Sequence, residues 1–292
     1  MRRREFIAGL GSAAAWPLAA RAQQPMPVIG YLSGSTPDAA ALYMPAFRQG
    51  LSEAGYVEGK NVAIEHRFAE GQYNRLPALA AELVTRQVAV IVATAGAELA
   101  AKAATATIPV VFSTGSDPVK SGVVSSFNRP GGNVTGLFVF AFSFGAKRLD
   151  MLREVIPNAR IIAVLVNPTM PDPASKADLA EVEAGAQAVG QQIAVLKASG
   201  ESEIDDAFAV MAQQRADAVV VMADPYFAGR INQIVALAAR YAIPAMYEWR
   251  SFAEAGGLMS YGSSSSDARR QMGIYTGKNQ ARRPARHAIG EG

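Results

Sequence analysis

The sequence predicts an α/β fold in which short parallel strands alternate with helices. Five apolar runs rich in β-branched residues have the composition of strands that are covered on both faces. They lie at 28–32, 88–93, 109–112, 161–166 and 218–222. A turn-rich segment at 128–133 divides the chain into two such series, from about 27 to 127 and from about 133 to 250. We therefore expect two doubly wound parallel-sheet lobes, with one large sheet as the alternative.

Stretches of helical period lie between the predicted strands. In each stretch, apolar residues recur three and four positions apart, which is typical of a helix with one face on a sheet. The clearest set is Leu76, Leu79, Ala80, Leu83 and Val84, followed by Ile231, Ile234, Val235 and Ala238, and by Leu179, Val182, Ala186 and Val189. We interpret all of these as core positions without a functional role.

The N-terminus predicts export. A basic start leads into an apolar stretch from Phe6 to Ala20, and Ala20-Arg21-Ala22 has the pattern of a signal-peptidase site, so we expect a signal peptide over 1–22 that is cleaved near Ala22. Arg3-Arg4 also fits the twin-arginine export pattern, with an ordinary secretory signal as the alternative. No later stretch is long and charge-free enough to span a bilayer, so the mature chain is expected in the periplasm.

Composition excludes several classes of site. The chain has no cysteine, which excludes disulfides, thiolate metal sites and a lipid-modified cysteine anchor. The net charge of +3 comes from the two ends of the chain, because residues 1–22 and 278–292 each carry +3 and residues 23–277 carry −3. Phosphate-backbone binding needs a localised positive surface, so we expect no nucleic-acid partner.

Polar side chains follow most of the predicted strands. In open parallel sheets, ligands bind at the carboxyl ends of the strands, so these side chains are candidates for a ligand site in a cleft between lobes. The candidates are Ser33, Ser35, Thr94, Thr114, Ser116 and Asp117 in the first series, and Asn167 and Asp224 in the second. Helix N-termini at the same edge can bind a carboxylate, which favours a small anionic or zwitterionic ligand. The alternative for each residue is helix capping.

Three aromatic residues at or near strand ends are candidate ligand walls: Phe140, Tyr226 and Tyr247. The alternative for each of them is a core position.

Enzyme signatures are weak in this sequence. His66 and His287 have no partner at metal-ligand spacing and form no evident Ser-His-Asp set. Residues 30–35 contain neither a dinucleotide fingerprint nor a P-loop. We expect no catalysis, cofactor or metal. The alternative of an exported hydrolase or isomerase that uses cleft carboxylates stays open.

Several long motifs resemble one family. They are IGYLSGS at 29–35, FRQGLSEAGYVEGKNVAIEHRFAEGQYNRLPALAAELV at 47–84, VVFSTGSDPVKSGVVSSFNRPGGNVTG at 110–136, VLVNP at 164–168, ADPYF at 223–227 and LAARYAIPAMYEWRSFAEAGGLMSYG at 237–262. The chain resembles the ABC transporter substrate-binding proteins of the tryptophan/tyrosine type, a branch of the type I periplasmic binding proteins.

The resemblance implies two lobes joined by hinge strands, with residues 27–136 and 259–277 in the first lobe and 137–258 in the second. It implies a monomer that closes on a small polar or amphipathic solute, with an amino acid as one candidate, and presents it to an ABC permease in the inner membrane. By position, the polar candidates would face this ligand: Ser33, Ser35, Thr94, Thr114, Ser116 and Asp117 from the first lobe, and Asn167 and Asp224 from the second. A ligand-sensing partner of a membrane receptor is a further alternative.

The C-terminus departs from the family pattern. The family continues past a Lys-Gly turn into a last β segment, whereas residues 278–292 are an Arg/Ala/Pro/Gly mixture without apolar period. We expect this tail to be disordered and hypothesise a frameshift near codon 278. The downstream DNA tests this hypothesis, which requires a Leu/Val/Ile-rich strand pattern in another frame.

Overall fold

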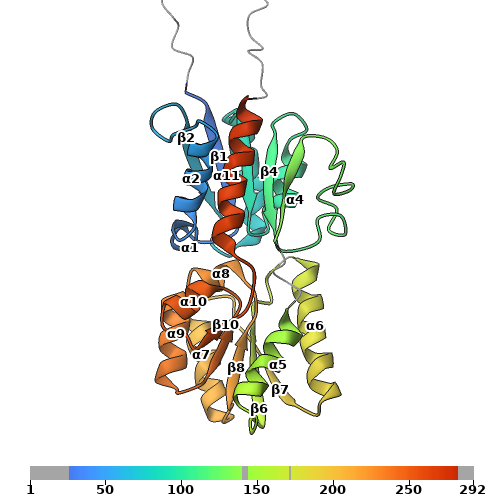
Figure 1. Cartoon of the computed structure of the whole chain (residues 1–292), viewed down its shortest axis with the longest axis vertical. Coiled ribbons are helices and arrows are strands. Elements are labelled where there is room, and N and C mark those ends of the chain that lie inside the picture. The colour runs from blue at the N-terminus through green and yellow to red at the C-terminus, as the bar shows by residue number, and fades with distance from the viewer. Residues whose placement is uncertain (1–25, 140–143, 171, 282–292) are drawn as a thin grey trace, which may run out of the picture.

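Two lobes stack along the long axis of the molecule (Figure 1). The computed structural model describes residues 26–139, 144–170 and 172–281. Each lobe contains a five-stranded, fully parallel sheet, with strand order β2-β1-β3-β4-β5 in the first and β10-β9-β8-β6-β7 in the second. The prediction of two doubly wound parallel-sheet lobes is confirmed. The expected signal peptide at 1–22 and the candidate residue Phe140 lie outside the described residues.

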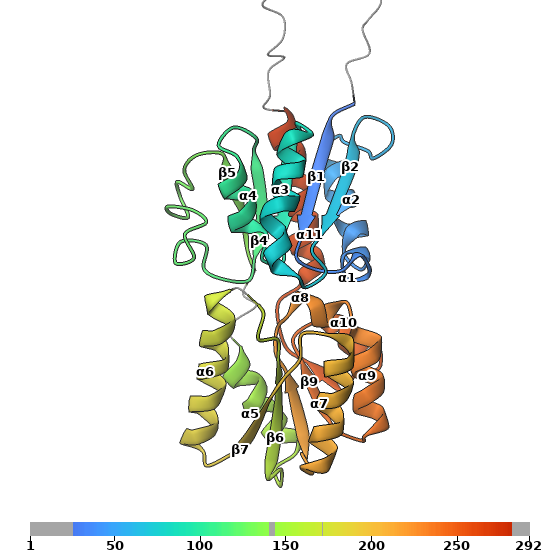
Figure 2. The same ribbon diagram turned by 180° about the vertical axis from the view of Figure 1, so that it is seen from behind.

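The first lobe has helices on both faces of its sheet (Figures 1 and 2). Its strands are β1 Val28–Ser33, β2 Ala63–Phe68, β3 Val90–Thr94, β4 Val110–Thr114 and β5 Val134–Phe138. Its helices are α1 Pro37–Ala41, α2 Met44–Glu53, the 3-10 helix η1 Tyr73–Arg75, α3 Leu76–Thr85, α4 Glu98–Ala104 and α11 Ser265–Ala281. One apolar core lies under α3 and α4, and another lies under α2 and α11.

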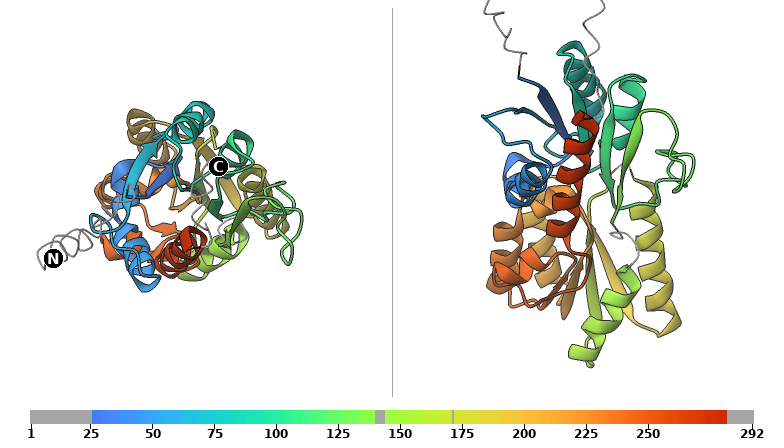
Figure 3. Two further views of the ribbon diagram at one scale, coloured as in Figure 1. Left: turned by 90° about the horizontal axis from the view of Figure 1, so that it is seen from above. Right: turned by 45° about the horizontal axis from the view of Figure 1, so that its top comes forward.

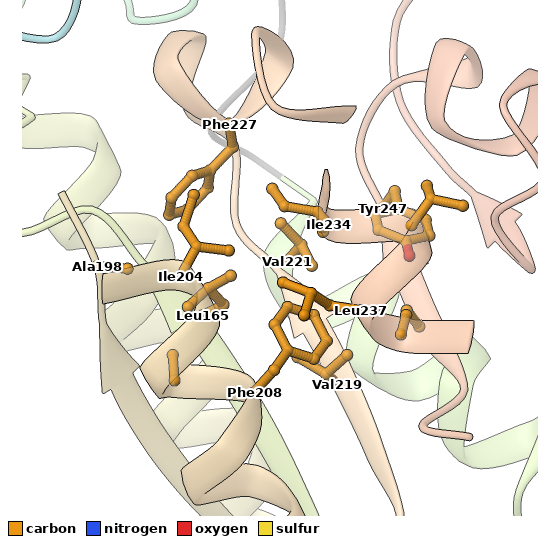
Figure 4. Packing of buried hydrophobic residues seen from close by; sticks show 14 of the residues in the cluster. Leu165, Ala198, Ile204, Phe208, Val219, Val221, Phe227, Ile234, Leu237 and Tyr247 are labelled. Atoms are coloured by element: carbon orange, nitrogen blue, oxygen red, sulfur yellow. The ribbon is translucent and has the colours of Figure 1, made fainter. Parts of the chain in front are cut away.

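The second lobe repeats this arrangement. Its strands are β6 Ile161–Val166, β7 Gln192–Lys197, β8 Ala218–Val221, β9 Ala245–Tyr247 and β10 Met259–Ser260. Its helices are α5 Gly145–Val155, α6 Pro173–Ala188, α7 Glu201–Gln213, α8 Pro225–Ala228, α9 Ile231–Arg240 and α10 Arg250–Glu254. Helices α5 and α6 cover one core, and Figure 4 shows the other, where Phe208, Phe227 and Tyr247 pack around Val219 and Val221.

Between residues 26 and 281, the part that the structure describes apart from its two gaps, the chain passes from one lobe to the other twice, at positions slightly different from those expected. Strand β5 pairs with β4 as far as Phe138, so the first crossing follows residue 138 instead of 136. Strand β10 pairs with β9, so residues 259–260 belong to the second sheet and the chain returns after Ser260. Helix α11 then lies along the first-lobe sheet (Figure 3).

The end of helix α11 shows that the predicted start of the disordered tail, residue 278, is wrong. The helix continues through Lys278, Asn279 and Gln280 to Ala281, because its first-lobe contacts extend the helical register past residue 277. Residues 282–292 lie outside the described residues. No helix in the described part of the chain is long and apolar enough to cross a membrane.

Candidate binding site

A cavity lies between the lobes, where the carboxyl ends of strands from both sheets face each other. It holds about 870 Å³ of space free of protein atoms, part of which is open solvent. The first lobe lines it from β1, α1, β3 and β4, the second lobe from the segments after β6, β8 and β9, and the returning chain from residues 263–269. Of the predicted site residues, Ser35, Thr114 and Asp224 line this cavity.

Hydroxyl groups at the ends of β1 and β3 form one buried network. Thr94 Oγ1 donates to Ser33 Oγ at 3.0 Å, and Ser33 Oγ and Ser35 Oγ share a hydrogen bond of 2.8 Å. Ser35 lines the cavity, whereas Ser33 and Thr94 lie behind it. Because all three residues are buried, the network fixes the rotamer that Ser35 presents.

Three polar residues at and after the end of β4 have different roles. Thr114 lines the cavity, and its Oγ1 accepts a hydrogen bond from the Ser116 amide at 3.2 Å. Ser116 Oγ donates across the lobe interface to Asp172 Oδ2. Asp117 instead caps the following turn, because its carboxylate accepts from the amides of Val119 and Lys120, and it does not line the cavity.

Asp224 serves both as a helix cap and as a bridge between lobes. Its Oδ1 accepts hydrogen bonds from the amides of Tyr226 and Phe227 and from Asn167 Nδ2, at 2.8, 3.2 and 3.2 Å. Its Oδ2 accepts from the hydroxyl of Tyr73, in the first lobe, at 3.5 Å. Asn167 therefore orients Asp224 and does not line the cavity itself.

The two described aromatic candidates lie in the core of the second lobe. Tyr247 has no exposed surface and stacks on Phe252 with ring centroids 4.6 Å apart, and Tyr226 packs under the guanidinium of Arg230. Neither residue lines the cavity, because Tyr247 packs in the apolar core against Phe252 and the Tyr226 ring lies next to Gly71 of the first lobe.

Apart from Asp224, the aromatic and charged residues that line the cavity were not among the predicted site residues. They are Tyr31, Tyr43 and Trp249, together with Glu98, Asp172, Glu248 and Arg269. The strand-end rule points to Glu248, which follows β9 directly. Arg269 comes from α11, and no local pattern places that helix beside the second lobe.

The sequence model of the family "ABC transporter substrate binding protein" matches residues 26–282. The chain belongs to this family. The resemblance identified from the sequence motifs is therefore confirmed.

Individual relatives support the same placement. A "Tyrosine-binding protein" of Clostridioides difficile (strain R20291) is 31% identical over 123 residues, which is 41% of this chain and 35% of that protein. The match thus spans about a third of the length of that relative.

Two solved structures are similar over most of their length. An ABC domain in complex with L-Trp from Streptococcus pneumoniae has 25% identity and a TM-score of 0.70, covering 86% of this chain and 82% of that chain. A conserved domain protein from Vibrio cholerae has 26% identity and a TM-score of 0.71, covering 87% and 83%.

The cavity of this substrate-binding protein is rich in carboxyl groups. Glu98, Asp172, Asp224 and Glu248 line it, with Arg269 as the lining arginine. Burial raises the pKa of Glu98 to about 7, and the negative charge of Asp172 adds to this effect. Burial raises the pKa of Asp224 to about 6 against the opposing effect of its hydrogen bonds, and that of Glu248 to about 8 against the opposing charge of Arg148.

A buried arginine supports Glu248 from behind the cavity. The side chain of Arg148, on α5, is fully buried, with Nη2 3.9 Å from Glu248 Oε1 and Nη1 3.8 Å from Asp178 Oδ2. Its Nε donates to the carbonyl of Tyr261 at 2.9 Å, on the segment that returns to the first lobe. Arg148 therefore connects a cavity wall to one of the two crossings.

The raised pKa values predict a pH-dependent stability of the ligand-free substrate-binding protein. These carboxyls bind protons in the folded state at pH values where they are ionised in the unfolded state. The stability that protonation provides is complete below the ordinary carboxyl pKa near 4 and is lost as the pH rises through 6 to 8. We expect the free energy of unfolding to fall from pH 5 to pH 8, by about 1.4 kcal/mol per pH unit for each carboxyl within its own window.

Urea unfolding at four pH values measures this effect, and Glu98→Gln should flatten the slope between about pH 4.5 and 7. A free energy of unfolding that rises steadily from pH 5 to 8 would contradict the pKa assignments.

Proposed function

We propose that this chain is the solute-binding component of an ABC import system and carries an aromatic amino acid between its lobes. The observation that supports this most directly is the cavity, which both lobes build from the carboxyl ends of their strands. Tyr31, Tyr43 and Trp249 line it and offer contacts for an aromatic side chain. The relatives described above, a tyrosine-binding protein and a structure with L-Trp, point to the same ligand class.

Contacts across the cleft support closure of the lobes around the ligand. Tyr73 donates to Asp224, Ser116 donates to Asp172, and the hydroxyls of Tyr43 and Ser251 lie 3.5 Å apart. Hinge closure of this kind uses segments that cross between domains, and within the described residues the chain leaves the first sheet after Phe138 and the second sheet after Ser260. Among the predicted residues, we propose Ser35, Thr114 and Asp224 as direct ligand contacts.

The proposed cycle needs no catalysis by this chain. The exported protein would bind the solute in the periplasm, close, and deliver it as a monomer to a permease in the inner membrane. The signal-peptide pattern over 1–22 supports the location, and membership in the family supports the permease partner.

A thermal-unfolding screen of the chain without residues 1–22 tests the ligand class. A ligand that binds only the folded state at 100 times its Kd adds about 2.7 kcal/mol of stability. We expect 1 mM L-tryptophan or L-tyrosine to raise the Tm by several degrees, and D-glucose and D-xylose to leave it unchanged. A shift with the sugars and none with any amino acid would show that the ligand class is wrong.

A further inference from the structure

Two side chains of the cavity, one acidic and one basic, each have a buried polar atom without a hydrogen-bond partner. These atoms are Glu248 Oε2 and Arg269 Nη1. Both residues line the cavity. Because buried polar atoms in folded proteins are nearly always hydrogen-bonded, a pair of such atoms in a ligand cavity points to two ligand groups of opposite charge.

Glu248 offers a site for a cation. The residue is 3% exposed, and its ion pair with Arg148 engages Oε1, so that Oε2 is the oxygen without a partner. The charge of Asp224 acts on Glu248, which places a second carboxylate near the same position. An ammonium group brings three donors and one positive charge, and it would compensate the desolvation that holds Glu248 protonated.

Arg269 offers a site for an anion. Its guanidinium lies over the ring of Tyr43, 5.7 Å from the centroid, which orients the group on the first-lobe side. The positive charge of Arg269 lowers the pKa of Glu98, so the two side chains are near each other. Glu98 Oε1, however, already accepts a hydrogen bond from the amide of Gly96. A carboxylate in the cavity would be the natural partner of a planar guanidinium.

Three of the helices that begin at the cavity, α1, α6 and α8, have N-terminal amides that are not free to bind an anion. Side chains already cap them: Thr36 accepts from the amide of Ala39 in α1, Asp172 from that of Ala174 in α6, and Asp224 from those of Tyr226 and Phe227 in α8. The capping interpretation thus applies at these ends, and two of the caps carry negative charge.

We propose that the cavity binds its ligand as a zwitterion, with the ammonium group on Glu248 and the carboxylate on Arg269. These two side chains then select ligands that carry both charges over the corresponding amine or acid. The inference rests on the proposed function, because it assigns the two ends of the amino acid that the protein would carry.

Titration calorimetry with three related ligands tests the assignment. L-tryptophan carries both charges, tryptamine lacks the carboxylate, and indole-3-propionate lacks the amine. We expect the wild-type chain to bind L-tryptophan at least about 100-fold more tightly than either analogue, since truncating one partner of a buried charge pair costs about 2–5 kcal/mol.

The variants separate the two ends of the ligand. Arg269→Gln should weaken L-tryptophan binding about 30-fold or more and leave tryptamine binding within about threefold. Glu248→Gln should weaken L-tryptophan binding similarly and leave indole-3-propionate binding unchanged. Matched controls are Arg270→Gln, whose arginine pairs with Glu53, and Glu254→Gln, whose glutamate pairs with Arg250; both should bind like wild type.

Three results would overturn the proposal. If neither L-tryptophan nor L-tyrosine binds the wild-type chain, both the zwitterion site and the proposed ligand class are wrong. If L-tryptophan binds but Arg269→Gln weakens it and tryptamine equally, the arginine does not hold the carboxylate. If both cavity variants keep the wild-type preferences, the assignment fails while the proposed function stands. Should Glu248→Gln unfold, the Arg269→Gln comparison decides.

Discussion

Replacing Arg148 with methionine is expected to lower the free energy of unfolding by about 3–5 kcal/mol. The arginine side chain is fully buried between Asp178 and Glu248, whose side chains are 0% and 2% exposed. Its removal leaves two desolvated carboxyls near each other without a compensating charge and takes away the donor to the Tyr261 carbonyl. Urea unfolding at pH 7 measures the loss.

Arg153→Met is the matched control for this change. Arg153 lies on the same helix, α5, and its ion pair with Asp150 is partly exposed, so its replacement should cost less than about 1 kcal/mol. A triple variant with Arg148→Met, Asp178→Asn and Glu248→Gln should recover part of the stability, because it also removes the two buried carboxyls that Arg148 contacts. Equal losses for Arg148→Met and Arg153→Met would show that the buried cluster does not stabilise the fold.

Replacing Gly273 with alanine is expected to destabilise the protein by about 2–3 kcal/mol, although alanine favours helices. Gly273 on α11 and Gly50 on α2 meet where these helices pack against each other. A Cβ atom at 273 would overlap the carbonyl oxygen of Phe47, and one at 50 would overlap that of Arg270. The helices would have to move apart, and α11 carries Arg269 into the cavity.

Gly185→Ala is expected to change the stability in the opposite direction. Gly185 is also helical, on α6, but its Cβ would lie 3.7 Å from the Cβ of Ala146, which is ordinary contact. This change should stabilise the chain by about 0.5–1 kcal/mol through helix propensity alone. If thermal unfolding shows Gly273→Ala to be as stable as Gly185→Ala, the close α2–α11 contact is not present in solution.

Strand-end reasoning located part of the cavity because parallel strands bring their carboxyl ends to one edge. Ser35, Thr114 and Asp224 lie there, with Ser33 and Thr94 directly behind. The same reasoning could not separate ligand contacts from caps, so Asp117 was included although it satisfies backbone amides of its own turn. Strand β9 has three residues, which is too short to show an alternation of apolar and polar side chains. The sequence therefore does not predict that the Tyr247 ring faces the core.

Other features depend on tertiary structure. Strand β2 lies at the edge of its sheet, has the sequence AIEHRF and is half-buried throughout. Because an edge strand can carry charged residues, β2 is not an apolar run and was not predicted as a strand. Arg269 lines the cavity because α11 returns to pack on α2. Arg148 becomes part of the site only because α5, α6 and the segment after β9 converge.

Calorimetric titration of a variant with a blocked cavity tests most directly whether this cavity binds an aromatic amino acid. Ala268 on α11 lines the cavity and is only partly buried, so Ala268→Trp should fill the site without disrupting a core, and Ala180→Trp on the exposed face of α6 is its control. We predict one L-tryptophan or L-tyrosine site per chain in the wild type and in Ala180→Trp, and at least about 100-fold weaker binding in Ala268→Trp, which should still unfold cooperatively. Wild-type affinity in a folded Ala268→Trp, or no binding of either amino acid to the wild type, would contradict the assignment.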